Sequence, residues 1–337
     1  MTNTATVPAR QNSAQTITGR AILLEIGSKL GVLDTFLTHK EISVADVAKE
    51  SGVAPPWIAS YYAALSHAGL ARPGPKVGGE VTHYHAAPDL QQSINDVGYV
   101  LWGLGSCAPL IANAVAFAKD LPTAANLHVR DGEHVARTSR WMGEQDFYPQ
   151  AEAAILASSP RKIVDLGSGT CGLLLRCLRK LPESRGVGID LSHDACVKAR
   201  SIVQAAGMDS RVSVIEAPIQ SLVNDPSPVE GADVIHGGFV FHDLMPDEEA
   251  TLNALLKTFR VAAPKAAVIV VDAVPYGPEP DEHAFSAAFT FLHSHFMARR
   301  LQPESEWKQR LTDAGFPNVS VSRLGISGGR IFTARAA

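Results

Sequence analysis

The sequence has few of the features that direct a protein to nucleic acid, to a membrane or to an oxidising compartment. Its net charge is −4 and it has no basic run, so nothing in it indicates a nucleic-acid partner. Its four cysteines form no CxxC pair and it shows no secretory leader, so we expect free thiols in a reducing cytoplasm. The longest apolar stretch, Ala266 to Val274, is too short to span a membrane. We therefore expect a cytoplasmic protein that binds neither nucleic acid nor a membrane.

The chain is long enough for more than one domain. It has 337 residues, of which 46% are apolar, and this composition can build a full core. Residues 1–16 are polar and unpatterned and predict a mobile tail. Short helices and the alternating stretch Glu80 to Tyr84 predict a winged-helix domain over residues 17–95. Residues 96–157 are predicted to form a helical connector and substrate lid, and residues 158–337 a catalytic domain.

The most informative stretch is Val164 to Gly172, an apolar strand that runs into a glycine-rich turn and then directly into a helix. A second apolar strand, Val187 to Ile189, ends in Asp190. Glycines allow a tight turn and close approach to a ligand, the helix start offers unpaired N–H groups, and the acid can hold two ribose hydroxyls. An ordinary turn would explain the glycines but not the acid. The stretch therefore predicts a nucleoside-binding site.

The order of residues in this turn indicates which nucleoside is bound. A dinucleotide fold carries Gly-x-Gly-x-x-Gly, whereas here Asp165 stands just before the first glycine of Asp-Leu-Gly-Ser-Gly-Thr-x-Gly. This motif resembles the first motif of class I S-adenosylmethionine (SAM)-dependent methyltransferases, over about Pro160 to the C-terminus. The resemblance implies SAM as cofactor, with its amino-acid half on the turn. The cofactor-binding residues that it implies are Asp165, Gly167, Ser168, Gly169, Asp190, Leu191, Ala217 and Gly238.

The rest of the chain alternates strands and helices up to a terminal antiparallel pair. This order predicts an α/β fold with a Rossmann-like, doubly wound, mostly parallel sheet and ligands at the carboxyl ends of its strands. A helix is expected after the strand Val212 to Ile215, and another over Asp281 to Arg300. Where the family carries Gly-Asp after the third strand to read the adenine amine, this chain has Ala217-Pro218.

The predicted winged helix raises the question of DNA binding. Its helix Pro56 to Leu65 has no Arg or Lys side chain to meet phosphates. The domain resembles the N-terminal dimerisation domain of small-molecule O-methyltransferases, and residues 21–70 carry more apolar surface than a small module buries internally. A homodimer is therefore expected. His83 and His85, on one face of the predicted wing strand, could bind a metal, but surface histidines are the favoured interpretation.

Candidate catalytic residues follow the fourth strand of the predicted sheet. His242 and Asp243 are expected to project toward the substrate. In plant-type O-methyltransferases a similar His-Asp pair supplies the base that deprotonates a phenol hydroxyl. The alternative is a pair that caps the next helix.

Two further histidines, His293 and His295, lie on the late apolar helix. A lone histidine on such a face is usually a core residue, but two here, with His242 expected nearby, indicate a metal site. Positions i and i+2 point to different faces of a helix, so only one of the two is expected to reach it.

A candidate substrate-binding residue is Arg130, whose guanidinium could hold a carboxylate through two hydrogen bonds. A surface arginine is the alternative. Trp141 and Phe147 follow it in the sequence.

These motifs together resemble the bacterial 2-oxo-acid β-C-methyltransferases, which make β-methyl amino acids for peptide antibiotics. The resemblance implies methylation at carbon 3 of phenylpyruvate, a branched-chain oxo acid or 5-guanidino-2-oxopentanoate. It assigns one transition-metal ion, iron or zinc, to His242 and His293, with His295 as a rival because the chain carries one extra residue before Trp307. It assigns the substrate carboxylate to Arg130. The remaining substrate-binding residues that it implies are Trp102, Trp141 and Phe147.

The implied chemistry would use the metal as a Lewis acid that stabilises an enolate chelated through the ketone and carboxylate oxygens. Two imidazoles, with Asp243, would leave open positions for that chelation. An O-methyltransferase needs neither the second histidine nor Arg130. The sequence therefore favours C-methylation of a 2-oxo acid. O-methylation of a phenol or related hydroxyl is the alternative, and a non-catalytic cofactor-binding protein comes third.

Overall fold

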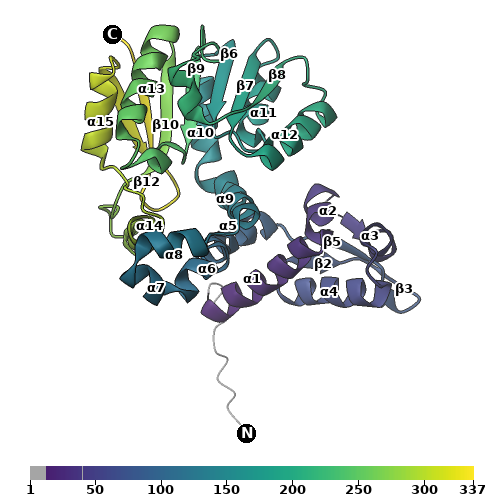
Figure 1. Ribbon diagram of the computed structural model, residues 1–337. Coiled ribbons are helices and arrows are strands. Elements are labelled where there is room, and N and C mark those ends of the chain that lie inside the picture. The colour runs from purple at the N-terminus through teal and green to yellow at the C-terminus, as the bar shows by residue number, and fades with distance from the viewer. Residues whose placement is uncertain (1–12, 40) are drawn as a thin grey trace. The chain divides into compact units, whose positions relative to one another are not determined.

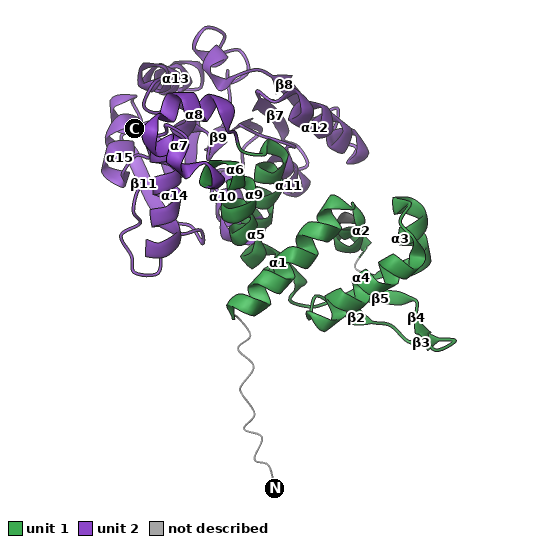
Figure 2. Cartoon of the chain, turned by 60° about the horizontal axis from the view of Figure 1, so that its bottom comes forward, with its two compact units in different colours: residues 1–111, 130–143 green, residues 112–129, 144–337 purple. Residues whose placement is uncertain are grey.

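The computed structural model describes residues 13–39 and 41–337 and divides the chain into two compact units (Figure 2). Unit 1 contains the residues up to 111 and residues 130–143, and unit 2 contains residues 112–129 and 144–337. The segment predicted as one connector is thus divided between the units. Residues 1–12 of the predicted tail lie outside the described residues, and helix α1 begins at Ala14 because the Ser13 side chain caps it by accepting from the Thr16 N–H.

Unit 1 is formed mainly by helices, with a small antiparallel sheet and a separate hairpin. Its helices are α1 (Ala14–Lys29), α2 (Val32–His39), α3 (Val44–Ser51), α4 (Pro55–His67), α5 (Leu90–Leu101), α6 (Ala108–Ala112) and α9 (Gly132–Asp146), with a π-helical turn at Trp102–Ser106. Its strands are β1 (Glu41–Ser43), β2 (Ala71–Pro73), β3 (Lys76–Val77), β4 (Glu80–Val81) and β5 (His83–Ala86). The three-stranded antiparallel sheet has the order β1-β5-β2, and β3 and β4 form a separate hairpin. Its core includes Leu24, Phe36 and Tyr62.

The predicted wing strand is divided in two in the structure. Glu80 and Val81 belong to the hairpin, whereas Tyr84 lies in the central strand β5, where it is buried. His83 contacts the Thr82 hydroxyl at 3.0 Å, and His85 lies 3.9 Å from a carboxylate oxygen of Glu41. The two histidines therefore have different partners, as expected of surface residues.

Unit 2 is built on a seven-stranded sheet with the order β11-β12-β10-β9-β6-β7-β8 (Figure 1). Its strands are β6 (Lys162–Leu166), β7 (Arg185–Asp190), β8 (Val212–Glu216), β9 (Val234–Gly238), β10 (Ala267–Ala273), β11 (Asn318–Arg323) and β12 (Gly329–Arg335). Strands β6 to β10 are parallel, and β12 runs antiparallel to both β10 and β11. The predicted doubly wound sheet and its terminal antiparallel pair are confirmed.

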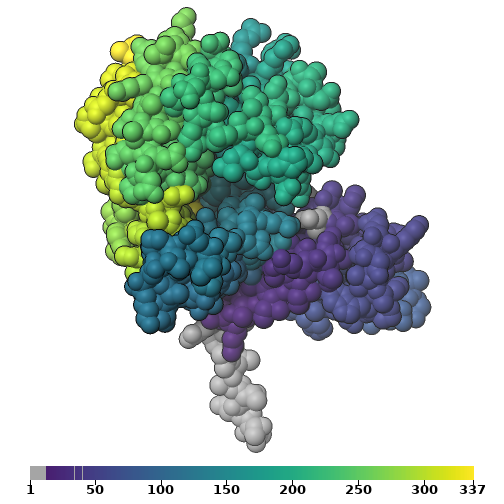
Figure 3. Space-filling view, viewed as in Figure 1, coloured from purple at the N-terminus to yellow at the C-terminus, as the bar shows by residue number. Residues whose placement is uncertain are grey.

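Helices cover both faces of this sheet. The α-helices are α7 (Ala114–Lys119), α8 (Leu121–Leu127), α10 (Tyr148–Leu156), α11 (Gly172–Lys180), α12 (His193–Ala205), α13 (Glu249–Ala262), α14 (His283–Phe296) and α15 (Glu304–Asp313). Val164 and Leu166 of β6 pack with buried residues of α13 and α15 in one core, so Asp165 between them points to the opposite face. In the space-filling view of Figure 3, green residues from the middle of the chain and yellow C-terminal residues lie side by side on the surface of this unit.

Two helix predictions differ from the structure. The segment after β8 is only a short 3₁₀ helix, Ile219–Val223, preceded by Pro218. The late helix α14 spans His283–Phe296 instead of residues 281–300, and Ala298 takes a positive φ of 52°. Since that conformation lies outside the right-handed helical region, the helix cannot continue to Arg300.

All four cysteines are free and buried, as the sequence predicts for thiols without partners. Within the part of the chain that the structure describes, no helix is long and apolar enough to cross a membrane.

Candidate active site

The glycine-rich turn joins β6 to α11 at the carboxyl end of the sheet. Gly167 and Gly169 take positive φ values of 66° and 53°, which residues with a Cβ rarely adopt. A Cβ on Gly167 would also lie 3.0 Å from the Val240 side chain. The backbone N–H groups of Gly167 and Ser168 both donate to the carbonyl oxygen of Ile189. The turn is therefore fixed against the neighbouring strand β7, and at Gly169 its backbone faces open space.

Asp190 lies at the end of β7 with its carboxylate held by the turn. Its two oxygens accept from the backbone N–H groups of Gly169, at 2.8 Å, and Ser192, at 2.9 Å. A carboxylate has about four acceptor positions, so two remain for the hydroxyls of a ribose. The neighbouring Leu191 side chain is 74% exposed and offers an apolar surface beside that position.

Asp165 is placed differently from the other predicted cofactor residues. Its side chain is buried and accepts a 2.7 Å hydrogen bond from Nδ1 of His236, the residue opposite it on β9. The sequence does not single out His236, because its partner is 71 residues away. Gly238, the last residue of β9, lies on the same face of the strand as His236.

The region predicted to read adenine has an unusual composition. The Ala217 N–H donates to the carbonyl oxygen of Asp190 at 2.9 Å. Glu216, at the end of β8, contacts Nδ1 of His193 at 3.0 Å. An exposed acid thus stands one residue before Ala217, where the family's acid is replaced by Pro218.

His242 is held by Asp272, a residue that the sequence pattern did not single out. It lies in the 3₁₀ helix Phe241–Leu244 after β9, and its Nδ1 is 2.6 Å from Oδ1 of Asp272 on β10. A carboxylate only accepts, so Nδ1 carries the proton, and in the neutral imidazole the lone pair is on Nε2. Asp272 is 1% exposed. It is an acid near the end of an otherwise apolar strand, and this feature of the sequence could have indicated that Asp272 belongs to the site. The pair has the geometry of a general base with its orienting acid.

His293, and not His295, lies beside His242. The two ring centroids are 5.1 Å apart with the planes at 89°. Nδ1 of His293 donates to the carbonyl oxygen of Phe289 at 2.7 Å, and its ring stacks on that of Phe289. His295 is exposed and packs on Phe291 instead. His293 and His295 therefore point to different sides of the helix, as the sequence predicts for positions i and i+2.

The predicted metal site lacks a complete set of ligands. Among residues 13–39 and 41–337, no group of three or more His, Cys, Asp or Glu side chains could hold a metal ion. Asp243, the third predicted ligand, lies 3.9 Å from Nε2 of His242 and pairs with Arg299 at 3.5 Å. The arrangement thus fits a metal poorly, and a transition metal is not supported by these residues.

The predicted substrate-binding residues are divided between the units. Arg130, Trp102 and Trp141 belong to unit 1, and Phe147 to unit 2. Arg130 is hydrogen-bonded to the Cys107 thiol; burial raises the pKa of this thiol, and the guanidinium partly opposes that rise. Trp141 is buried in the core of unit 1. Their roles toward a substrate stay predictions.

Phe147 pairs with an aromatic side chain at the end of β9. Its ring lies edge-on to Phe239, with the centroids 5.1 Å apart. Phe239 takes a positive φ of 52°, which is uncommon for a bulky residue and is often found at functional sites. Phe239 stands three residues before His242 in the sequence.

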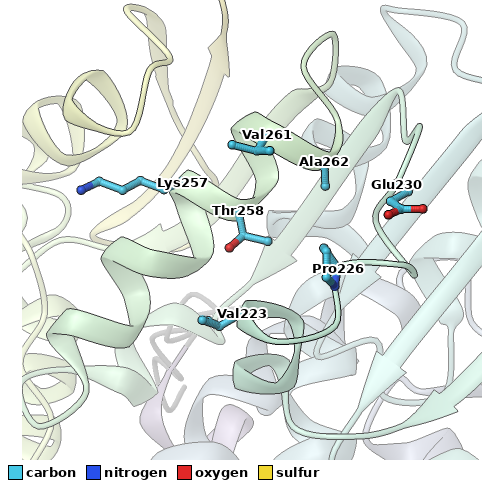
Figure 4. A pocket seen from close by; sticks show the side chains of 7 residues that line it. All are labelled: Val223, Pro226, Glu230, Lys257, Thr258, Val261 and Ala262. Carbon is cyan, nitrogen blue, oxygen red and sulfur yellow. The ribbon is translucent and has the colours of Figure 1, made fainter.

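The hollow shown in Figure 4 lies elsewhere in unit 2. It is lined by residues of the 3₁₀ helix after β8, the following loop and α13, among them Pro226, Glu230 and Thr258. None of the predicted site residues lines it.

Comparison with known proteins agrees with the geometry of the turn. Residues 157–314 match the sequence profile of a family described as a methyltransferase domain. The chain thus contains a methyltransferase domain with the class I fold, and the matches support a SAM-dependent methyltransferase. The matched residues include the glycine-rich turn, Asp190 and both buried histidine–aspartate pairs.

Relatives of this methyltransferase are distant. It is 23% identical over 307 residues to methyltransferase ungE′ of Aspergillus campestris, covering 88% of this chain and 87% of that protein. It is 28% identical over 166 residues to (R,S)-reticuline 7-O-methyltransferase of Papaver somniferum, covering 48% of this chain and 42% of the relative. The structure of human N-acetylserotonin methyltransferase with SAM has a TM-score of 0.58 at 14% identity, covering 98% of this chain and all of the other. The last comparison confirms the predicted fold class.

Proposed function

We propose that this methyltransferase methylates a hydroxyl oxygen of a small molecule, with His242 as general base. The observation that carries the proposal is the 2.6 Å hydrogen bond between Nδ1 of His242 and Asp272. Support also comes from the Papaver somniferum relative, whose name describes a 7-O-methyltransferase. O-methylation replaces C-methylation as the favoured function, because O-methylation needs only the base and the cofactor.

The mechanism uses each residue of the site in one role. SAM, when bound, supplies an electrophilic methyl group on its sulfonium. Nε2 of His242 takes the proton of the substrate hydroxyl, so the oxygen becomes a better nucleophile. Asp272 orients the imidazole and stabilises the imidazolium that forms. Phe147 and Phe239 offer ring edges to an aromatic substrate, and a positioned hydroxyl then meets the methyl group in line.

C-methylation of a 2-oxo acid remains a second candidate because of one observation. His293 lies beside His242, and its Nδ1 donates to a backbone carbonyl, so its neutral form also presents Nε2 as an acceptor. A phenol methyltransferase does not need this second imidazole. In this reading Arg130 would hold the substrate carboxylate, and Arg130→Lys should chiefly raise KM for the oxo acid.

The decisive experiment supplies ¹³C-methyl SAM with either a panel of phenols or a panel of 2-oxo acids, with and without prior treatment with EDTA. O-methylation predicts a labelled O–CH₃ product by NMR and activity that survives the chelator. A labelled C–CH₃ product from an oxo acid, lost on chelation and restored by iron or zinc, would replace the proposal by the second candidate.

We also propose a homodimer formed through unit 1. Helix α1 and its C-cap residue present three exposed apolar side chains at helical spacing, Ile22, Ile26 and Leu30. Such a stripe is typical of a surface that a second subunit covers. Light scattering at micromolar concentration should give twice the chain mass, and Ile26→Asp should give a monomer. A monomeric wild-type protein would refute this.

A further inference from the structure

Strand β9 carries a second histidine whose bonding is incomplete. Nδ1 of His236 is 2.7 Å from Oδ1 of Asp165, and the two residues are 4% and 5% exposed. The carboxylate can only accept, so Nδ1 donates and the lone pair of the neutral imidazole is on Nε2. Across the described part of the chain, Nε2 is one of the few buried polar atoms with no hydrogen-bond partner. Buried acceptors of this kind are rare in folded proteins unless something else satisfies them.

The imidazole leans toward the cofactor turn. A Cβ built on Gly238, two residues further along the same face, would lie 3.2 Å from Cε1 and 3.6 Å from Nε2 of His236. Nε2 is therefore on the side of the ring nearer the carboxyl end of the strand. On the paired strand, Asp165 stands two residues before Gly167, where the turn begins. The unsatisfied acceptor thus faces the edge of the sheet at which ligands of this fold bind.

The absence of a side chain at Gly238 has a direct consequence. Any larger residue would crowd the ring of His236 and would cover the end of the strand beside it. With glycine there, a ligand lying on Gly238 can approach the imidazole. Gly237 on β9 is in register with Leu166 on β6. The residues that follow them, Gly238 and Gly167, are therefore next to each other at the ends of adjacent strands.

We infer that Nε2 of His236 accepts a hydrogen bond from the α-ammonium group of SAM. The amino-acid half of SAM carries one cation and one anion. The N–H groups at the start of α11 suit the carboxylate, whereas the pair of Asp165 and neutral His236 carries negative charge and offers an acceptor, which suits the ammonium. Asp165 acts through His236 by holding the proton on Nδ1. The inference depends on SAM binding at the turn and is independent of which substrate atom is methylated.

The test uses three ligands that differ only at the amino-acid end. S-adenosylhomocysteine has both charged groups, decarboxylated S-adenosylhomocysteine keeps the ammonium alone, and methylthioadenosine has neither. Two variants separate the nitrogens of the ring: His236→Asn retains a donor for Asp165 but removes Nε2, and His236→Gln places an amide near the position of Nε2. Affinities are measured by calorimetry without acceptor substrate, and thermal melting reports on the fold.

His236→Asn should lower the affinity for S-adenosylhomocysteine and for decarboxylated S-adenosylhomocysteine by about tenfold each, as expected for one hydrogen bond to a charged group. Its affinity for methylthioadenosine should stay within about twofold of wild type. His236→Gln should recover part of the loss.

Three results would overturn the inference. Equal losses for all three ligands would assign His236 a structural role. A loss confined to S-adenosylhomocysteine would mean that the carboxylate is the partner. Unchanged affinities would mean that His236 does not contact the cofactor. Since no acceptor substrate is present, none of these outcomes depends on the proposed O-methylation.

Discussion

Strand β9 and the turn that follows it carry two buried histidines, each of which makes the same bond to an aspartate. His236 donates from Nδ1 to Asp165 on β6 at 2.7 Å, and His242 donates from Nδ1 to Asp272 on β10 at 2.6 Å. Strand β9 lies between β6 and β10, so the two pairs reach to opposite neighbours. In each, the aspartate selects the same tautomer of the imidazole.

The pairs differ in where the second nitrogen lies. His236 is inside the strand, and its Nε2 has no hydrogen-bond partner among the described residues. His242 is in the 3₁₀ helix beyond the strand end, with the Asp243 carboxylate 3.9 Å from Nε2 and the ring of His293 beside it. The same chemical pair therefore suits two tasks: an acceptor for a bound cofactor within the sheet, and a base for a substrate beyond its edge.

The largest expected effect is at the base. His242→Asn should lower kcat by about 10²–10⁴-fold, because general-base catalysis contributes that much, and should leave the Kd of S-adenosylhomocysteine unchanged. Steady-state kinetics and calorimetry on the same sample check both. His236→Asn is the matched control, since it should change cofactor affinity. If both variants changed only the cofactor affinity, the two pairs would not differ in function.

The next largest effect is expected for Asp272→Asn, which should lower kcat by roughly a hundredfold. The amide cannot stabilise an imidazolium as a carboxylate does, and it can hold the ring in the wrong tautomer. KM should change little, since Asp272 is buried behind His242. Kinetics over a range of substrate concentration separate the two constants. A rise in KM at constant kcat would place Asp272 in substrate binding instead.

A third buried acid shows what a purely structural pair should do. Glu282 is 1% exposed and bonds Arg330, which holds its pKa at about 2, well below the usual value. A lowered folded pKa means stability that is present above about pH 4.5 and lost as pH falls toward 2, up to roughly 3 kcal/mol. Glu282→Gln should remove that part of the pH dependence of unfolding without changing cofactor affinity. An unchanged dependence from pH 5 to 3 would contradict this.

The smallest effect concerns the other end of the cofactor. Asp190→Ala should weaken binding of S-adenosylhomocysteine and methylthioadenosine alike by roughly 1.5–3 kcal/mol, because both ligands carry the ribose. His236→Asn should distinguish these ligands. Calorimetry with the two compounds tests this. Unchanged affinities in the Asp190 variant would contradict the assignment of Asp190 to the ribose hydroxyls.

The sequence predicted the framework of the site well. Gly167 and Gly169 require a turn that only glycine adopts readily, and Asp190 ends a strand whose apolar pattern is plain, so the turn and its acid could be placed together. His242 stands after a strand that the same pattern identifies. The late helix was predicted too long, because its end depends on the backbone at Ala298 and not on side-chain pattern.

The sequence by itself determined the alternating fold, the glycine-rich turn and the position of His242, since these follow from local backbone preferences and from the periodicity of apolar residues. Only the tertiary structure decided the partners of the two histidines. Asp165 and Asp272 lie 71 and 30 residues from the rings they hold. Such contacts arise from strand order and register, which place distant residues side by side, and no local pattern encodes them. The choice of His293 over His295 has the same origin, because it depends on which side of α14 faces the end of β9.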